Sequence, residues 1–572
     1  MFDAIKSLEE LIKGSSYLFN SLWVLVAAVF VFFMQAGFAC CESGSARSKS
    51  ACNIWLKNAV DFCVGALVFY FIGFGLMYGD DWHGLIGING FLNPLDQDLV
   101  IWDGLGLSPQ VYLLFQTMFC ATTATIISGS VAERFKFGTY IWVSVFMTGF
   151  VYPIVGHWIW GGGWLAQLGF SDFAGSTAVH SVGAWAALVC ATLVGARTGK
   201  YTKDGKVNGI PGHNIPMLVL GVFILWVGWY GFNPGSELAL DDTTFYTAVT
   251  TTFAAAAGGL GAMFTSWIRY QKPDVSLAAN GCLGGLVAIC TGVASVSYLG
   301  SIIIGLLAGI LLVSAVSFFD RILKIDDPVG AISIHGVCGI FGTVCGGLFD
   351  MEQGLFYGGG ASHLLHQCVG IAAVGAFVVM VVGVYVFILK HIMGIRISLE
   401  EELKGLDLAE HGMVAYPEFA GMGTSLPSVP ITYINADAES REIPPVAVSS
   451  ESGKMHRVEI ITNKSKFEEL KNALNSIGIA GMTVSQVEGC GVQKGHKSYY
   501  RGAEVNMTLL PKVKVETVVS KVPVELIIET ARNVLYSGHA GDGKIFVYEI
   551  DNAVRISSGE TGVDALQYPD HK

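Results

Sequence analysis

Apolar residues dominate five long stretches of the chain that contain neither lysine nor arginine: 58–133, 137–196, 207–268, 273–320 and 325–389. Each stretch holds two long apolar runs, and one further run precedes the first stretch. An apolar helix of about 20 residues spans a bilayer. The pattern therefore predicts a polytopic all-α membrane protein with eleven transmembrane helices. A soluble protein with buried helices is the weaker alternative, because soluble helices usually run for only about three turns. The expected spans are 20–40, 58–79, 109–130, 137–158, 174–196, 213–233, 244–268, 277–295, 299–319, 331–349 and 360–393.

Charged residues divide the loops between these spans into two kinds. Lysine and arginine gather near residues 47–49, 134–136, 197–206, 269–272, 321–324 and 390–396, whereas the other loops are rich in aspartate and glutamate. Since basic loops stay in the cytoplasm, we expect the N-terminus outside and the C-terminus in the cytoplasm, across the cytoplasmic (inner) membrane. The first nineteen residues lack the basic start and the cleavage site of a signal peptide, so we expect a retained amphipathic segment.

Composition narrows the possible functions. The net charge of -12 sums groups from both sides of the membrane and says little about partners, among which we expect lipid but no nucleic acid. Eleven of the twelve cysteines fall within or beside the spans without recurrent CxxC spacing, which predicts packing thiols. His363 and His366 lack a third ligand, so we expect no metal site. Without a nucleophile or paired-carboxylate motif, an enzyme is the weakest class.

Two similar segments indicate an internal repeat. The fifth span begins with Asp172 and carries His180 eight residues later, and the tenth begins with Asp327 and carries His335 at the same spacing. The first and sixth spans also share Gly-Phe followed by Gly-Ser. Because helices five positions apart cross the membrane in opposite directions, the two halves form a 5+5 inverted repeat, with the eleventh span outside it.

The histidines of this repeat are candidate functional residues. Each lies about two helical turns from its aspartate, near the bilayer midplane, where such repeats form their sites. An ionisable group there is costly unless it has a partner, so we predict that His180 faces His335. Asp172 is expected to cap its helix and support the site. The simpler alternative is that each imidazole only bonds a neighbouring helix.

From about residue 18 to 416 the chain resembles ammonium transporters of the Amt/Mep/Rh superfamily. The matching segments are 115–119, the Trp160-Gly-Gly-Gly163 turn, 172–180, 231–236 and 326–339. The resemblance implies a homotrimer with one pore per subunit and ammonium or methylammonium as substrate. It further implies a recruitment site of Trp160, Ser236 and Phe119, a gate of stacked Phe119 and Phe232 rings, and a proton relay of His180 and His335.

These residue types suit ammonium. The N–H donors of the ion can be met by a hydroxyl and by aromatic faces, in a cation–π contact worth about 0.5 to 2 kcal/mol. A hydrated ion cannot pass an apolar constriction without losing its water, so neutral ammonia would cross. Two touching imidazoles, each both donor and acceptor, would pass the proton. The residues leave open whether ammonia plus a proton or intact ammonium moves.

The C-terminal part of the chain has a different composition. We expect the membrane domain to end at residue 396, and a cytoplasmic tail and Pro/Ser-rich linker to cover 397–453. From 454 to 572, strands at 458–461, 484–487, 513–519 and 545–550 alternate with helices at 467–477 and 525–535, with a long polar loop before the third strand. This order predicts a cytoplasmic α+β domain with a ferredoxin-like fold.

That domain resembles PII signal proteins of the GlnK/GlnB type, through 476–484, 493–496, 500–504, 510–513 and 541–544. Residues 538–544 also fit GxxxxGK, but Ile545 replaces the required Ser or Thr and a strand follows, so we reject a P-loop. The resemblance implies an ADP or ATP site between subunits and a 2-oxoglutarate site, with magnesium, at Gln493 and Lys512. The nucleotide residues would be Gly481, Met482, Thr483, Gly541, Asp542, Gly543, Lys544 and Arg555.

Departures from the PII pattern bear on control. Val505 stands where many relatives carry a uridylylated tyrosine, so that modification should be absent. Val492 and Ser557 each replace a basic residue, and 462–464 departs from the usual Lys-Pro, which weakens the case for tight ATP binding and favours ADP or another nucleotide. By resemblance, Arg501 is the loop residue that plugs the cytoplasmic mouth of the pore. A fused domain would do so at millimolar effective concentration.

Two functions from different classes remain open. The first is ammonium uptake regulated by the fused nucleotide-binding domain. The second is an ammonium sensor that signals through this domain with little flux. A regulatory domain that reports outward and never enters the pore is the alternative to the Arg501 plug. The ammonia-permeable Rh branch is weaker, because it lacks the aromatic recruitment site suggested by Trp160.

Overall fold

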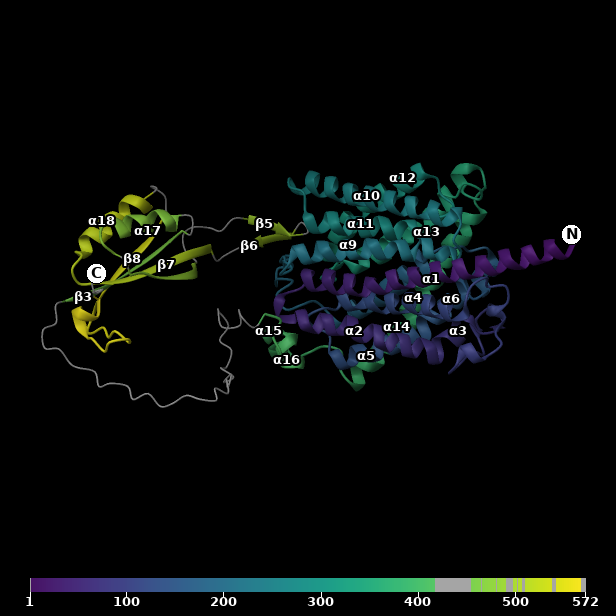
Figure 1. The fold of residues 1–572 in the computed structure, drawn as a ribbon, viewed down its shortest axis with the longest axis horizontal. Coiled ribbons are helices and arrows are strands. Elements are labelled where there is room, and N and C mark those ends of the chain that lie inside the picture. Colours follow the sequence, from purple (N-terminus) through teal and green to yellow (C-terminus); the bar gives the residue numbers. More distant parts are fainter. Residues whose placement is uncertain are drawn as a thin grey trace. The chain divides into compact units, whose positions relative to one another are not determined.

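The computed structural model describes residues 2–416, 454–463, 466–479, 481–489, 497–500, 503–506, 510–536 and 542–566. They form a helical unit and an α+β unit, which Figure 1 shows coloured along the sequence. The predicted linker over 417–453 lies outside the described residues, as do Val492, Gln493, Arg501 and Gly541. The exact limits of the predicted domains therefore stay predictions.

The helical unit confirms the predicted membrane protein. Within the described residues, ten helices or helix runs are long and apolar enough to span a membrane, and α11 is a shorter apolar helix. Together they match the eleven predicted spans. The elements of these spans are α1 (Phe2–Ser45), α2 (Ala51–Val68) with η2 (Phe69–Gly73) and α3 (Phe74–Tyr78), α4 (Pro109–Ser130), α5 (Phe137–Phe146) with η5 (Met147–Val151), α6 (Tyr152–Ile159) and α7 (Trp164–Leu168), η6 (Ser176–Ser181) with α8 (Val182–Val194), α9 (Ile215–Phe232) with η7 (Pro234–Glu237), α10 (Asp242–Tyr270), α11 (Val275–Ile289), α12 (Tyr298–Ser317) with η8 (Phe318–Leu323), η9 (Ile332–Val337) with α13 (Cys338–Phe349), and α14 (Ser362–Ile392).

The same local structure opens the fifth and tenth spans, as the predicted inverted repeat requires. The Asp172 carboxylate accepts bonds from four backbone N–H groups, those of residues 175–178, at 2.7–3.0 Å. The Asp327 carboxylate accepts bonds from the backbone N–H groups of Gly330 and Ile332 at 2.9 and 2.8 Å. Each aspartate precedes a π-helical segment, η6 or η9, that carries the histidine. The wider π turns, which often occur at functional sites, were not predicted.

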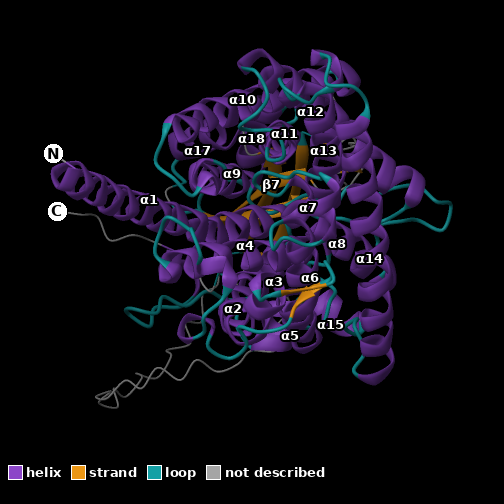
Figure 2. Ribbon diagram, turned by 90° about the vertical axis from the view of Figure 1, so that its right-hand side faces the viewer, coloured by secondary structure: helices purple, strands orange, loops and turns teal. Residues whose placement is uncertain are grey.

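Helices α1 and α9, the first spans of the two halves, pack closely against each other (Figure 1). Glycines make this approach possible: a Cβ on Gly44 would lie 2.5 Å from the Leu218 nitrogen, and one on Gly231 would lie 2.3 Å from the Ala27 carbonyl. Helix α14 lies along the outside of the bundle beside α8 (Figure 2). Residues 2–19, predicted as an amphipathic segment, form the first part of α1, and the helix continues from there without a break to Ser45.

The predicted cytoplasmic tail forms two short helices, α15 (Leu399–Lys404) and α16 (Leu406–His411), that bind the membrane-spanning unit. The Asp407 carboxylate accepts bonds from the backbone N–H groups of Cys52 and Asn53, at 3.0 and 2.8 Å, where α2 begins. Glu402, also buried, accepts a 2.6 Å bond from the Thr198 backbone. A carboxylate at a helix N-terminus is favourable, so the tail is part of the helical unit rather than of the linker.

The α+β unit has the predicted ferredoxin-like fold. Its antiparallel sheet has the order β4-β7-β3-β8, with Val458 between Thr517 and Val547 in register. The strands are β3 (Met455–Asn463), β4 (Thr483–Gly489), β7 (Leu510–Val519) and β8 (Gly543–Ile550), and the helices are α17 (Phe467–Ser476) and α18 (Val524–Leu535). Apolar side chains of both helices pack with Val458 and Val515 into one core. The predicted polar loop instead contains a hairpin, β5 (Lys497–Tyr500) and β6 (Ala503–Asn506).

Candidate functional site

The predicted recruitment residues Trp160, Phe119 and Ser236 come from three spans. The Trp160 indole donates a 2.7 Å bond to the Asp172 carbonyl, which fixes the ring, and its edge meets the Phe119 ring at a centroid distance of 6.2 Å. Trp160 and Ser236 are both partly exposed. The Ser236 hydroxyl donates to the Phe232 carbonyl at 2.6 Å. Because its proton is engaged there, the Ser236 oxygen is left to accept from an N–H donor.

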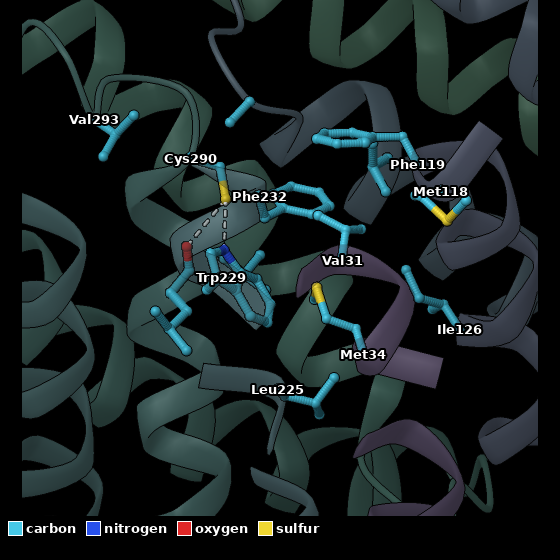
Figure 3. Close-up of a cluster of buried hydrophobic side chains, with 14 of the residues drawn as sticks. Val31, Met34, Met118, Phe119, Ile126, Leu225, Trp229, Phe232, Cys290 and Val293 are labelled. Atoms are coloured by element: carbon cyan, nitrogen blue, oxygen red, sulfur yellow. Dashed lines mark hydrogen bonds between the residues drawn. The ribbon is translucent and has the colours of Figure 1, made fainter. Parts of the chain in front are cut away.

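Two stacked rings lie directly inward from this group. The centroids of Phe119 and Phe232 are 4.1 Å apart, and the rings are inclined by only 17°. Both side chains are buried, with 2% and 0% of their surface exposed. Figure 3 shows the two rings together among other apolar side chains. The stack comes from α4 in one half of the repeat and α9 in the other, so it forms a buried apolar contact between the halves.

His180 and His335 are in contact behind these rings. Their Nδ1 atoms lie 3.2 Å apart, and both side chains are buried. Since two acceptor nitrogens do not bond each other, one Nδ1 carries a hydrogen that it donates to the other. The His180 ring also stacks on Phe232 at a centroid distance of 5.2 Å. The pair therefore continues the aromatic stack and joins the two halves of the repeat through one hydrogen bond.

Sequence reasoning missed three further residues of this site. The Trp229 ring stacks on His180 at 5.3 Å, and its indole donates to the Cys290 sulfur at 3.3 Å (Figure 3). The Cys290 sulfur lies 3.8 Å from His180 Nε2, and the Phe38 ring lies 5.9 Å from the His335 ring. Trp229 precedes Phe232 by three residues, a helical spacing that places both on one face, and this signal was available. Cys290 is distant in sequence and carried no such signal.

Asp172 links the outer group to the histidine pair. Besides its four backbone bonds, its carboxylate accepts a 2.9 Å bond from the Thr291 hydroxyl, while its carbonyl holds Trp160. This aspartate caps η6 as predicted and at the same time ties the position of the Trp160 ring to that of His180.

Five of the predicted nucleotide residues of the α+β unit line two separate hollows. Gly481 and Arg555 line one, and Asp542, Gly543 and Lys544 line the other, whereas Met482 and Thr483 line neither. One protomer thus carries two partial surfaces, which is what a site completed between subunits would need. Gly543 has a φ of +141°, and a Cβ there would lie 2.1 Å from the Ile461 carbonyl, so this turn requires glycine.

Two of the predicted basic ligand residues, Arg555 and Lys512, already have protein partners. The Arg555 guanidinium contacts Glu560 at 2.6 Å and the carbonyls of Asp564 and Ala565 at 3.3 Å. The Lys512 amine donates a 2.5 Å bond to the Asn463 amide oxygen, on the strand beside it. Lys544 is exposed, whereas Met482 is partly buried and packs against the core. Lys544 thus suits a phosphate in the present arrangement, and Arg555 would have to exchange partners to reach one.

Comparison with known proteins places these units in two families. Residues 22–416 match the Ammonium Transporter Family, and residues 455–560 match the nitrogen regulatory protein P-II. A putative ammonium transporter of Synechocystis is 45% identical over 409 residues, covering 69% of this chain and 89% of the relative. Ammonium transporter Amt2 of Archaeoglobus fulgidus is 41% identical, covering 71% of this chain and 90% of the relative. A solved structure named Sensor Amt Protein is similar with a TM-score of 0.67 and 38% identity, covering 70% of this chain and 99% of its own.

Proposed function

Because the chain belongs to the Ammonium Transporter Family, whose members are transporters rather than enzymes, we propose that it carries ammonium across the cytoplasmic membrane under control of its fused P-II domain. The observation that carries this proposal is the 3.2 Å contact between His180 and His335 behind the stacked rings of Phe119 and Phe232. Moving a proton through an apolar passage requires polar groups in contact with each other, and this histidine pair would supply them.

The first step of the proposed mechanism is recruitment. Trp160 and Phe119 offer ring faces to the cation, and the Ser236 oxygen accepts one of its N–H donors. The ion then meets the Phe119–Phe232 stack, which has no group to replace its water. Loss of a proton at this point lets neutral ammonia pass. A potassium ion has no proton to give and stays outside, so the constriction selects by chemistry rather than by size.

The second step is passage of the proton. His180 takes it on one ring nitrogen and releases the hydrogen of the other to His335 across the Nδ1 contact. Cys290 and Trp229 hold the remaining edge and face of His180, so the ring keeps its orientation while the proton moves. In this proposal the two products, ammonia and a proton, reach the cytoplasmic side together and recombine there.

An ammonium jump on proteoliposomes fixed to a solid-supported membrane tests this function. We expect a transient inward current that His180→Ala and His335→Ala each reduce at least tenfold. Empty liposomes and a potassium jump serve as controls. Absence of current from the wild-type protein, purified in its native oligomer, would rule out electrogenic transport. The family resemblance predicts that this oligomer is a homotrimer, with the N-terminus outside and the P-II domain in the cytoplasm.

Regulation by the P-II domain is the second part of the proposal. The domain would bind ADP or ATP at Gly481, Met482, Thr483, Gly541, Asp542, Gly543, Lys544 and Arg555, and 2-oxoglutarate with magnesium at Gln493 and Lys512. Ligand binding would decide whether Arg501 enters the pore of its own or a neighbouring subunit. Currents measured with each ligand, in wild type and Arg501→Ala, test the plug. A ligand response that survives Arg501→Ala would exclude it.

An ammonium sensor is the second candidate, because a solved structure with 38% identity is named Sensor Amt Protein. In that case ammonium would bind at the outer group and change the state of the P-II domain with little flux. The two candidates differ in one measurement. A sensor gives no transient current in the ammonium jump, yet ammonium still shifts the affinity of the purified full-length protein for ADP, because the coupling between two sites is reciprocal.

A further inference from the structure

A small cavity lies next to the histidine pair. It is bounded by His335, Phe38, Glu42, Ser45, Asn280 and Val329, among other residues of α1, α4, α9, α11 and the segment leading into η9. Glu42 is the only carboxylate that lines this cavity in the described part of the chain. A proton leaving His335 therefore meets Glu42 as the nearest acidic group bordering the same space.

The structure holds Glu42 in place with one oxygen left over. Only 2% of its surface is exposed. The Ser128 hydroxyl donates to its Oε2 at 2.8 Å, and the Asn58 amide donates to the same oxygen at 3.1 Å. Among the described residues, both of these bonds go to Oε2, and the other carboxylate oxygen of Glu42, Oε1, accepts neither. Gly129 makes room for this side chain, because a Cβ there would lie 3.1 Å from the Glu42 Cγ.

The charged groups around Glu42 carry one more negative than positive charge. Lys57 is fully buried, its amine has no hydrogen-bond partner in the described residues, and it lies 5.2 Å from the centre of the Tyr140 ring. Asp61, one helical turn further along α2, is also fully buried. Two carboxylates thus share one ammonium group. Glu410 also attracts the Lys57 amine and Arg134 repels it, and these two further charges are opposite in sign. One buried negative charge is left uncompensated, and a bound proton would neutralise it.

Of the two carboxylates, Glu42 is the better place for that proton. Both oxygens of Asp61 already accept hydroxyl bonds, one from Tyr140 at 2.6 Å and one from Ser144. Asp61 also does not line the cavity. Glu42 borders the cavity and concentrates its two bonds on one oxygen. Geometry and charge count therefore select the same residue.

We propose that Glu42 is a further proton-carrying residue of the pore, which accepts the proton beyond His335 and passes it to water on the far side of the cavity. This inference rests on the proposed function. In the step, the N–H bond of the protonated His335 breaks as an O–H bond forms on Glu42, directly or through water in the cavity. The carboxylic acid then releases the proton to water on the far side of the cavity, and Lys57 offsets only part of the carboxylate charge until the next proton from His335 arrives.

Glu42→Gln is the variant that tests this, because an amide keeps the shape and can accept from Ser128 and Asn58 but cannot take up the proton. Full-length wild type, Glu42→Gln and Glu42→Asp are reconstituted with a pH dye inside. An ammonium jump is then read as current and as internal pH, with empty liposomes subtracted. We expect Glu42→Gln to lose at least tenfold of the current while ammonia still enters and makes the interior alkaline. Glu42→Asp, which keeps an acid, should retain current within threefold of wild type.

Other results would overturn the proposal. A wild-type current in Glu42→Gln would show that the proton takes another route. Loss of both current and alkalinisation, with an unchanged melting temperature, would make Glu42 a structural part of the pore. Should the variant fold poorly, infrared difference spectra of the wild type decide. An ammonium jump must then produce a carboxylic-acid C=O band that shifts in Glu42→Asp, and its absence refutes the role. A wild type without current but with this band would instead refute transport alone.

Discussion

Asp172→Asn is the most informative single substitution in the membrane unit, because it changes one charge without changing size. In the wild type, Oδ1 accepts bonds from Gly175 and Ser176, and Oδ2 accepts bonds from Thr177 and Ala178. An asparagine keeps one oxygen. Its amide nitrogen would face two backbone N–H donors that then have no acceptor, at the start of the segment that carries His180.

The expected magnitude follows from these bonds. A hydrogen bond to a charged group contributes about 1.5 to 3 kcal/mol, so losing two costs roughly 3 to 6 kcal/mol. Thr291→Val is the matched control, since it removes a single 2.9 Å bond to the same carboxylate and should cost about 1.5 to 3 kcal/mol. We expect Asp172→Asn to lower the melting temperature in detergent by about twice the shift seen for Thr291→Val.

The same substitution should also affect function. Because the Asp172 carbonyl holds the Trp160 indole, a loosened N-terminus of η6 displaces the recruitment ring and His180 together. The ammonium-induced current in proteoliposomes is expected to fall at least tenfold, with Thr291→Val close to wild type. The reasoning would be refuted by an Asp172→Asn protein whose melting temperature and current both equal those of the wild type. A normal melting temperature with no current would refute only the energetic part.

Three other predictions concern separate parts of the chain. In Asp326→Asn, the melting temperature should fall less steeply toward acid pH than in the wild type. Burial acts to raise the pKa of Asp326, but Arg197 and Arg134 outweigh it and hold that pKa well below its usual range. Its stabilisation is therefore complete above about pH 4 and is lost as pH falls toward the lowered folded value; an equally steep fall contradicts this. Gly543→Ala should destabilise the α+β unit far more than Gly478→Ala. The left-handed backbone at Gly478 makes an alanine cost about 1 to 3 kcal/mol, but its Cβ would meet open space. Equal shifts in melting temperature would exclude the clash between a Cβ at 543 and the Ile461 carbonyl. Trp229→Phe should keep the current within threefold, because a ring still stacks on His180, whereas Trp229→Leu should lower it tenfold; equal currents would exclude stacking.

Much of the fold was predictable because each span is governed by local apolarity. The runs of apolar residues and the basic loops predicted eleven helices. The Asp-x7-His spacing predicted the inverted repeat and the pairing of His180 with His335. The π segments η6 and η9 were not predictable, because their extra residue per turn arises from packing between distant helices. The same limit applies to Cys290, whose place beside His180 depends on a contact 110 residues apart.

The buried charges of α1 and α2 show a different limit of sequence reasoning. Glu42, Lys57 and Asp61 were absent from the sequence analysis because each is a single charge near the end of an apolar run: Glu42 and Lys57 lie just outside the expected spans, and Asp61 lies near the start of one. Their significance comes from burial: an ammonium group with 0% exposure must be balanced by carboxylates within the same packed region. Only the tertiary structure shows which carboxylates those are, and that one of them borders the cavity beside His335.

Transport and sensing place different demands on this region, and that difference motivates our preference for transport. A sensor needs ammonium to bind at Trp160, Phe119 and Ser236 and needs a conformational consequence. It has no use for a bonded histidine pair behind an apolar constriction, or for an acid bordering the space beyond it. Buried ionisable groups in a membrane are costly, and they persist where a charge must move. His180 contacts His335, and Glu42 borders the same cavity as His335. A proton that passes between them would account for all three groups, so a sensor would have to assign each of them another role.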